Sequence, residues 1–233
     1  MGRAIELNDA HVLVVDDEKF VRGMTRRILG LAGVANISEA IDGGDGLSKV
    51  MADPPDLVIL DIMMEPMNGL KFLKTVRIGL SGGPRDLPVI VLTGSDEQSV
   101  FGTAMALDCN AFVRKNEGPD VIRERMTRVL DETFEIKESK AYQSVTIPDI
   151  TIIKADEDVP ASTEQPQEVT PPPTRACEIM IEDVEVGAVV ARDVTTEDGN
   201  MLLTAGSVLS ASYLNRLRDI SGIIELSSIW VEQ

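Results

Sequence analysis

Several apolar stretches of this 233-residue chain end at polar residues whose types suit phosphoryl chemistry. If the stretches are parallel strands, their carboxyl ends lie along one edge of a sheet, where ligands bind in such folds. The polar residues at these ends are Asp16, Asp17, Asp61, Thr93 and Lys115. Three carboxylates, one hydroxyl and one ammonium group at a single edge predict a site that holds a divalent cation and a phosphoryl group.

Asp61 is the candidate acceptor, because a carboxylate can attack phosphorus and form an acyl phosphate. The reaction requires that charge on the phosphoryl oxygens be neutralised. Asp16 and Asp17 beside Asp61 would repel it, and Mg²⁺, which prefers carboxylate and water oxygens, would remove that conflict. Lys115 supplies a second positive charge, and Thr93 can donate a hydroxyl hydrogen bond to the same group.

The first 135 residues alternate strand-like and helical segments. This alternation is typical of βαβ units, so we expect an α/β fold with a doubly wound sheet of five parallel strands. The expected strands span 12–16, 35–40, 57–61, 88–93 and 111–114, and the expected helices span 18–32, 44–52, 68–79, 96–107 and 119–135.

Apolar residues at helical spacing predict which helix faces are buried. The helix over 18–32 places Val21, Met24, Ile28 and Leu31 at this spacing. The helix over 68–79 should bury Leu70, Leu73 and Val76.

Composition divides the chain into an N-terminal domain (1–138), a flexible acidic and proline-rich linker (139–176), and a small α+β or mostly-β C-terminal module (177–233). The core of the linker, 155–174, is too polar to bury the apolar surface that ordering requires. The stretch 143–153 is more apolar, and it could either add a strand or dock on a neighbour.

The C-terminal module alternates apolar runs with turn signals. The runs 186–194 and 201–210 flank Asp198-Gly199, which favours a hairpin. A short amphipathic helix over 211–220 should be capped by Ser210, and the runs within 223–233 should form closing strands.

Charge and composition exclude several function classes. The C-terminal module carries three arginines against ten acidic residues, so its net charge of −7 opposes binding to nucleic acid. The sequence has no apolar run of membrane-spanning length, and its first residues lack the apolar core of a signal peptide. Cys109 and Cys177 lack metal-ligand spacing and suit a reducing cytoplasm. A single histidine, His11, excludes histidine-rich metal sites.

Four segments together resemble the receiver domain of bacterial response regulators. They are VLVVDDEK (12–19), DLVILDIMM (56–64) with Gly69 eight residues after Asp61, VLTGS (91–95) and FVRK (112–115), and the resemblance covers about residues 10–135. It implies a flavodoxin-like fold with Asp61 as phosphoacceptor. It also implies that Asp16, Asp17, Asp61 and the backbone carbonyl of Met63 hold Mg²⁺, that Thr93 and Lys115 bind the phosphoryl group, and that Thr93 and Phe112 act as conformational switches.

Two positions depart from the receiver pattern. Glu65 stands where the family usually has proline, with Pro66 one residue later, and Asn116 replaces the cis proline that usually follows the lysine.

The C-terminal module resembles a small module that accompanies HD-GYP-type phosphodiesterases, although no His-Asp dyad follows it here.

The resemblance implies a cytoplasmic response regulator that accepts a phosphoryl group from a sensor histidine kinase or phosphotransfer protein. Its catalysis would be limited to Mg²⁺-dependent self-phosphorylation from phosphodonors and self-dephosphorylation. Its output would be an unknown downstream protein or a phosphorylation-dependent homodimer, without nucleic acid or membrane insertion. The alternatives are a docking scaffold that needs no phosphorylation, and an adaptor that senses a ligand or partner through the C-terminal module.

Overall fold

The N-terminal domain is built on a five-stranded parallel sheet. The structure, a computed structural model, describes residues 6–94, 98–132, 136–148, 176–196, 201–224 and 226–232. The strands follow the order β2-β1-β3-β4-β5, which confirms the predicted doubly wound sheet. They are β1 (His11–Val15), β2 (Asn36–Ala40), β3 (Leu57–Asp61), β4 (Val89–Thr93) and β5 (Ala111–Arg114).

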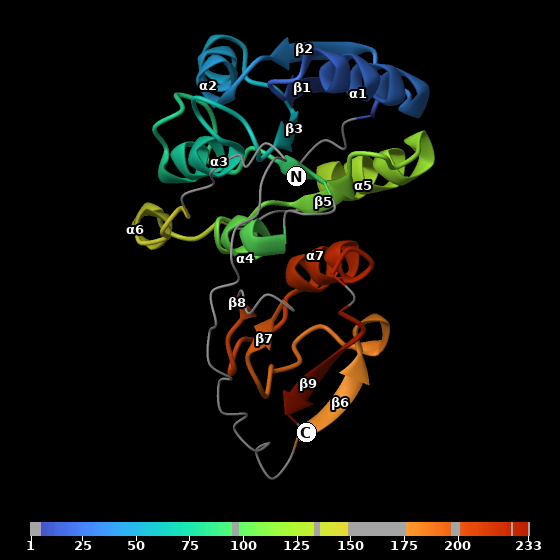
Figure 1. Ribbon diagram of the computed structural model, residues 1–233, viewed down its shortest axis with the longest axis vertical. Coiled ribbons are helices and arrows are strands. Elements are labelled where there is room, and N and C mark those ends of the chain that lie inside the picture. Colours follow the sequence, from blue (N-terminus) through green and yellow to red (C-terminus); the bar gives the residue numbers. More distant parts are fainter. Residues whose placement is uncertain are drawn as a thin grey trace, which may run out of the picture.

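Helices cover both faces of this sheet (Figure 1). One face carries α1 (Lys19–Ala32) and α5 (Pro119–Asp131), and the other carries α2 (Gly43–Ala52), α3 (Gly69–Ile78) and α4 (Gln98–Ala106). Alternate residues of each central strand enter different cores. Val12, Val14 and Ile59 face α1 and α5, whereas Leu13 and Leu60 face the other layer. This period of two is the one that a strand buried on both faces requires.

The buried face of α1 differs from the predicted one. Met24 and Leu31 are exposed, and the helix instead buries Arg22, Thr25, Leu29 and Ala32. The physical reason is that the Arg22 guanidinium finds backbone acceptors beneath the helix, which makes burial of its charge tolerable. The prediction for α3 is confirmed, because Leu70, Leu73 and Val76 are all buried.

The residues after the N-terminal domain do not all behave as a linker. A short helix, α6 (Ser139–Gln143), lies against α3, and its Tyr142 is fully buried and donates a 2.8 Å hydrogen bond to Asp108 Oδ2. Lys74 donates to the carbonyls of Gln143 and Val145. The predicted boundary at residue 138 is therefore too early. Two alternatives were open for residues 143–153: an added strand, or docking on a neighbouring element. The structure supports docking for residues 143–148. Residues 149–153 and 155–174 lie outside the described residues.

The C-terminal module has two small antiparallel sheets and one helix. The first pairs β6 (Ala176–Met180) with β9 (Ser228–Glu232), and the second pairs β7 (Val194–Thr195) with β8 (Met201–Leu203). These pairings confirm the hairpin and a closing strand, while the turn at 197–200 lies outside the described residues. A 3₁₀ turn, η1 (Ile181–Asp183), follows β6.

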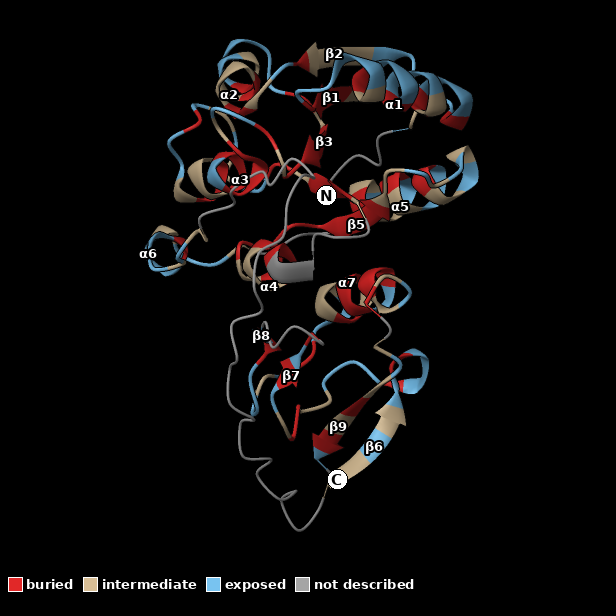
Figure 2. Ribbon diagram, viewed as in Figure 1, coloured by how far each residue is buried: buried red, intermediate tan, exposed pale blue. Residues whose placement is uncertain are grey.

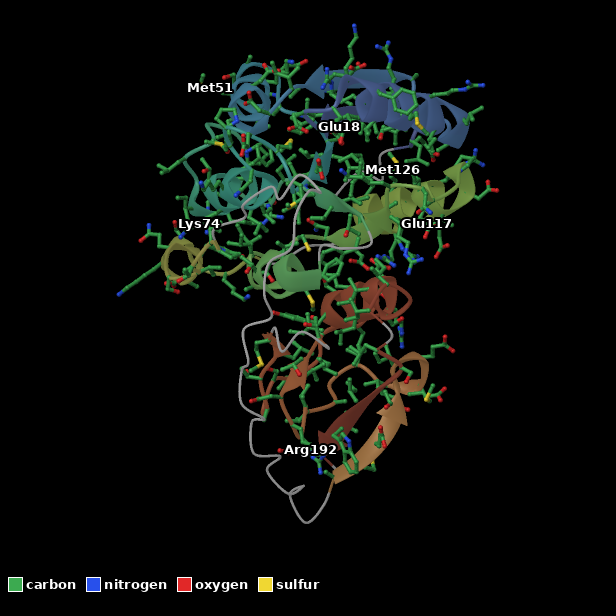
Figure 3. The ribbon with its side chains drawn as sticks, viewed as in Figure 1. Glu18, Met51, Lys74, Glu117, Met126 and Arg192 are labelled. Atoms are coloured by element: carbon green, nitrogen blue, oxygen red, sulfur yellow. The ribbon has the colours of Figure 1, made fainter. Side chains whose placement is uncertain are left out.

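Helix α7 (Ala211–Ser221) links the C-terminal module to the N-terminal domain. Ser210 caps it as predicted, because its Oγ accepts from the backbone N–H of Tyr213 at 3.2 Å. Figure 1 shows α7 between the small sheets and β5, and Figure 2 shows that much of the helix is buried. At the far end of the module, Arg192 lies 4.3 Å from the centre of the Trp230 ring (Figure 3).

One continuous apolar core joins the module to the N-terminal domain. It includes Phe101 and Phe112 from the domain, and Leu214, Leu217 and Ile220 from α7. The expectation that the linker leaves the module decoupled from the N-terminal domain is therefore wrong. The apolar contact between α7 and the domain holds the two parts together, and the composition of the linker gives no sign of that contact. Among the described helices, none has the length and hydropathy needed to cross a membrane.

Candidate functional site

The carboxyl ends of β1, β3, β4 and β5 bring the predicted site residues together. Lys115 Nζ lies 3.0 Å from Asp61 Oδ1 and 3.9 Å from Asp16 Oδ2. One carboxylate oxygen from each of Asp16, Asp17 and Asp61 lies within 4.8 Å of the others. Asp61 and Asp16 are buried and Asp17 is exposed, so the cluster extends from the interior of the domain to its surface at this edge of the sheet.

Lys115 is placed by the sheet itself. Its backbone N–H donates to the carbonyl of Thr93 at 3.0 Å, which extends the pairing of β5 with β4 by one step. Among the described residues, the one cis peptide bond joins Glu65 to Pro66, so the bond from Lys115 to Asn116 is trans. The absence of a cis proline after Lys115 does not prevent the ammonium group from reaching Asp61.

A residue that sequence reasoning missed fixes the acidic loop after β1. Arg22 of α1 donates from Nη1 to the carbonyls of Asp16 and Asp17, at 2.8 and 3.0 Å. Asp16 Oδ1 also accepts from the backbone N–H of Glu18 at 2.8 Å. The available signal was an arginine one helical turn beyond the acids, on the face that closes over the loop. These contacts hold the loop in the position that places carboxylate oxygens of Asp16 and Asp17 within 4.8 Å of Asp61.

The donor set fits a hard divalent cation. Asp16 Oδ2 is buried and accepts no hydrogen bond, which is costly for a carboxylate oxygen unless a cation lies nearby. Asp16, Asp17 and Asp61 offer only oxygen ligands, as Mg²⁺ prefers. Met63 donates its backbone N–H to Asp61 Oδ1 at 3.4 Å, while the role of its carbonyl as a ligand stays a prediction.

Burial and like charge favour the protonated form of these carboxyl groups. The pKa of Asp16 is raised to about 7, first by burial and then by Asp61, with Lys115 and the Glu18 N–H acting in the opposite direction. Burial also raises the pKa of Asp61, against the lowering effect of Lys115. A bound cation would replace the missing counter-charge, so the cation-free cluster is the electrostatically unfavourable state.

We expect the Asp17→Asn variant to bind Mg²⁺ at least about tenfold more weakly, because one carboxylate ligand or its hydrogen-bonding support is lost. Isothermal titration with MgCl₂ measures the affinity. The melting temperature of the metal-free variant should be equal to or above that of the wild type, since one of three like charges is gone. An unchanged Mg²⁺ titration would show that the cluster is not a metal site.

We also expect the metal-free protein to lose stability as the pH rises from about 4 to about 7. The pKa of Asp16 is about 7 in the fold and 3.8 as the ordinary value, so the folded state holds an extra proton in this window. Urea unfolding at several pH values in the presence of a chelator measures the slope. The Asp16→Asn variant, which cannot ionise, should lose this component of the slope.

Thr93 and Phe112 occupy the predicted switch positions. Thr93 is buried, and its Oγ1 donates to the carbonyl of Gly94 at 2.8 Å rather than to a group at the acidic cluster. The Phe112 ring is buried and meets the Phe101 ring edge-on, with the centroids 5.2 Å apart. Phe112 is thus already inside the core in this structure, and its role as a conformational switch stays a prediction.

Gly69 is also required by the geometry of the acceptor strand. Its backbone N–H donates to the carbonyl of Ile62 at 3.0 Å, which holds the start of α3 close to the end of β3. A Cβ at this position would lie 2.1 Å from the carbonyl oxygen of Asp61. The glycine found in the sequence eight residues after the acceptor therefore allows this close approach.

The response regulator receiver domain family matches residues 12–127 of this chain. This match, with the parallel sheet and the acidic cluster beside Lys115, defines the N-terminal part of the chain as a receiver domain. The match ends before the C-terminal module, so it gives no support to the resemblance of that module to the one found with HD-GYP-type proteins.

Individual relatives are similar to about 60% of the chain. The chain is 30% identical to the transcriptional regulatory protein YvrH of Bacillus subtilis over 142 residues, which are 60% of this chain and 57% of that protein. It is 30% identical to the response regulator MprA of Mycolicibacterium vanbaalenii over 141 residues, 60% of this chain and 59% of that one. The chain therefore spans less than two thirds of the length of these relatives.

Solved structures are similar to about half of the chain. The chemotaxis protein CheY4 of Vibrio cholerae is 27% identical with a TM-score of 0.46, and covers 52% of this chain and 98% of its own. The receiver domain of AraT from Geobacillus stearothermophilus is 28% identical with a TM-score of 0.46, and covers 52% of this chain and 93% of its own.

Proposed function

We propose that this chain is a two-component response regulator that accepts a phosphoryl group on Asp61. The observation that carries the proposal is the position of Lys115 Nζ, 3.0 Å from Asp61 Oδ1, beside three carboxylates that can share a cation. Similarity to a family of receivers supports it. The donor would be a sensor histidine kinase or a phosphotransfer protein, and the protein would act in the cytoplasm.

Each residue has a physical role in the proposed reaction. A carboxylate oxygen of Asp61 attacks phosphorus, and the bond from phosphorus to the donor breaks as the phosphoryl group moves. Lys115 neutralises charge on the phosphoryl oxygens, and Thr93 donates its hydroxyl hydrogen to one of them. Asp16, Asp17, Asp61 and the Met63 carbonyl would hold Mg²⁺, which would supply further neutralisation of charge on the phosphoryl oxygens. Hydrolysis returns the Asp61 carboxylate and releases inorganic phosphate.

The proposed output is contact with another protein. The acidic C-terminal module opposes a phosphate backbone, with three arginines against ten acids, and two of these arginines are occupied by backbone or acidic groups. YvrH is named a transcriptional regulatory protein, but only 57% of its length is similar to this chain. A phosphorylation-dependent homodimer is a further proposed assembly.

Acetyl phosphate tests the proposal without knowledge of the kinase. With Mg²⁺ present, it should transfer one phosphoryl group to each chain and release acetate, and intact-protein mass spectrometry measures the added mass. Chelation of Mg²⁺ should abolish the transfer. A chain that stays unlabelled under conditions that label a known receiver would instead support the docking-scaffold alternative.

A further inference from the structure

The sheet that β6 forms with β9 in the C-terminal module has one open side. β6 pairs with β9 and with no other strand of the described residues. β9 is bonded on both sides, because the backbone N–H of Ala191 donates to the carbonyl of Trp230 at 2.8 Å, and that of Glu232 donates to the carbonyl of Val189 at 2.9 Å. Figure 1 shows β6 on the outer side of β9, at the end of the molecule away from the N-terminal domain. β6 is therefore an edge strand.

The register of this pair shows which backbone groups face the open side. The N–H of Ile181 donates to the carbonyl of Ser227 at 3.0 Å, just beyond the last paired residues of the two strands. In an antiparallel pair, residues that bond to the partner strand alternate with residues that face away from it. The odd-numbered residues of β6 therefore face β9. The N–H and C=O groups of Glu178 and Met180 face the open side, in position to pair with an added strand.

The side chains of β6 define what an added strand would meet. Cys177 and Ile179 pack against the core of the module, whereas Glu178 and Met180 are exposed on the outer face. Ser228 Oγ donates to Glu178 Oε1 at 2.6 Å, which holds that carboxylate over the sheet. Every second side chain of an added strand would lie beside one of these two residues. A basic residue suits Glu178, and an apolar residue two positions away suits Met180.

Further acidic residues lie at both ends of this edge. Glu232 is opposite Ala176, the first residue of β6, and Glu182 and Asp183 follow the strand in η1. All three are exposed, as Glu178 is. The ion pairs of the described residues involve none of these four carboxylates. A second copy of β6 would bring like charges together, whereas a basic segment would be complementary.

We propose that the free edge of β6 is a docking site for an extended, basic segment of a partner protein. The segment adds to the sheet as a strand, with a lysine or arginine beside Glu178 and an apolar residue beside Met180. Backbone hydrogen bonds supply affinity, and the acidic residues select basic sequences. The inference rests on the proposed function in one respect, because it names the kind of protein that the output contacts.

The probe is the peptide acetyl-Lys-Thr-Val-Thr-Lys-Thr-Val-amide, whose lysines and valines alternate on one face when it is extended. One comparison peptide has glutamate in place of both lysines. Another carries N-methyl groups on the three central residues, so that both of its edges lose hydrogen-bond donors. In amide NMR spectra of the full chain, the lysine peptide should shift resonances of residues 176–183 and slow exchange of the Glu178 and Met180 amides. Neither comparison peptide should do so at the same concentration.

The Met180→Pro variant removes one outward N–H from the edge. The φ angle of Met180 is −62°, which a proline ring allows, and Ile179 before it is extended, as a residue before proline must be. Proline is accepted in an edge strand where its nitrogen faces solvent, so the melting temperature should not change. The variant should bind the lysine peptide about threefold or more weakly, the effect of one lost hydrogen bond. Met180→Leu keeps the N–H and should bind as the wild type does.

The Glu178→Lys variant tests the charge preference. It should weaken binding of the lysine peptide and strengthen binding of the glutamate peptide. Asp53→Lys makes the same change of charge at an exposed site of the N-terminal domain and should leave the preference unchanged. All of these variants should accept a label from acetyl phosphate as the wild type does, because none alters a residue of the phosphorylation site.

Several results would overturn the docking site. They are absence of peptide binding, equal binding of the lysine and N-methylated peptides, shifts confined to residues outside 176–183, and undiminished binding by Met180→Pro. A wild-type dimer that Met180→Pro dissociates in analytical ultracentrifugation, without peptide binding, would make the edge an interface between copies instead. The proposed function is tested apart from this site. Normal peptide binding by a chain that acetyl phosphate does not label would sink only the phosphoacceptor, and labelling without peptide binding would sink only the docking site.

Discussion

The Asp61→Asn variant should take up no phosphoryl group from acetyl phosphate in the presence of Mg²⁺. Asparagine keeps the size and planarity of the side chain but lacks the nucleophilic carboxylate. Asp61 is the one carboxylate of the described cluster whose oxygen lies 3.0 Å from Lys115 Nζ. Neither Asp16 nor Asp17 has that contact at hydrogen-bonding distance, so neither should substitute as acceptor.

Mass spectrometry of the intact chain measures this loss. The matched control is Asp53→Asn, which neutralises an exposed acid just before the opposite end of the same strand and should label like the wild type. Circular dichroism should show that the Asp61→Asn variant remains folded. Labelling of that variant at normal stoichiometry would place the acceptor elsewhere and remove the basis of the proposed function.

The second large effect is expected from Gly69→Ala. The added Cβ would lie 2.1 Å from the carbonyl oxygen of Asp61 and 2.9 Å from Cα of Ile62, and both atoms belong to the backbone that carries the acceptor. Relief of the clash must therefore move Asp61 itself. We expect a loss of about 1–3 kcal/mol in the free energy of unfolding, as for overpacked sites. A displacement near 1 Å should slow labelling about a hundredfold.

Urea unfolding and the initial rate of labelling measure the two effects. Gly30→Ala is the control, because its Cβ meets no atom within 4 Å and helical alanine stabilises by about 0.5–1 kcal/mol relative to glycine. A Gly69→Ala variant with wild-type stability and labelling rate would show that the backbone at the end of β3 accommodates the added Cβ without displacing Asp61.

The site could be predicted from sequence because its information is local. Each site residue follows an apolar run, and the place where the run stops marks the end of a strand. Strand β3 was predicted to end at Asp61 and β5 at Arg114, and the structure places both ends there. The parallel sheet then brings the strand ends together, whatever their separation along the chain.

The contacts that escaped prediction depend on partners distant in sequence. Arg22 was not assigned to the site because its place soon after the two acids was the only signal, and the sequence does not show that its acceptors are backbone carbonyls of that loop. Tyr142 lies in a polar stretch, and its burial rests on its place in the apolar core and on the hydrogen bonds that its hydroxyl makes with Asp108 and with the backbone N–H of Lys137. Asp219 and Arg128 are separated by 91 residues, and a single sequence holds no signal for such a pair.

The docked position of α7 also sets a threshold for self-association. A segment tethered to its own receiver competes at an effective concentration on the order of millimolar. A second copy present at about micromolar concentration would need roughly a thousandfold greater affinity for the same face to displace it. A homodimer formed across the edge of β5 therefore requires that α7 first dissociate from this edge. In the docked state, α7 competes with a second copy of the chain for the same face.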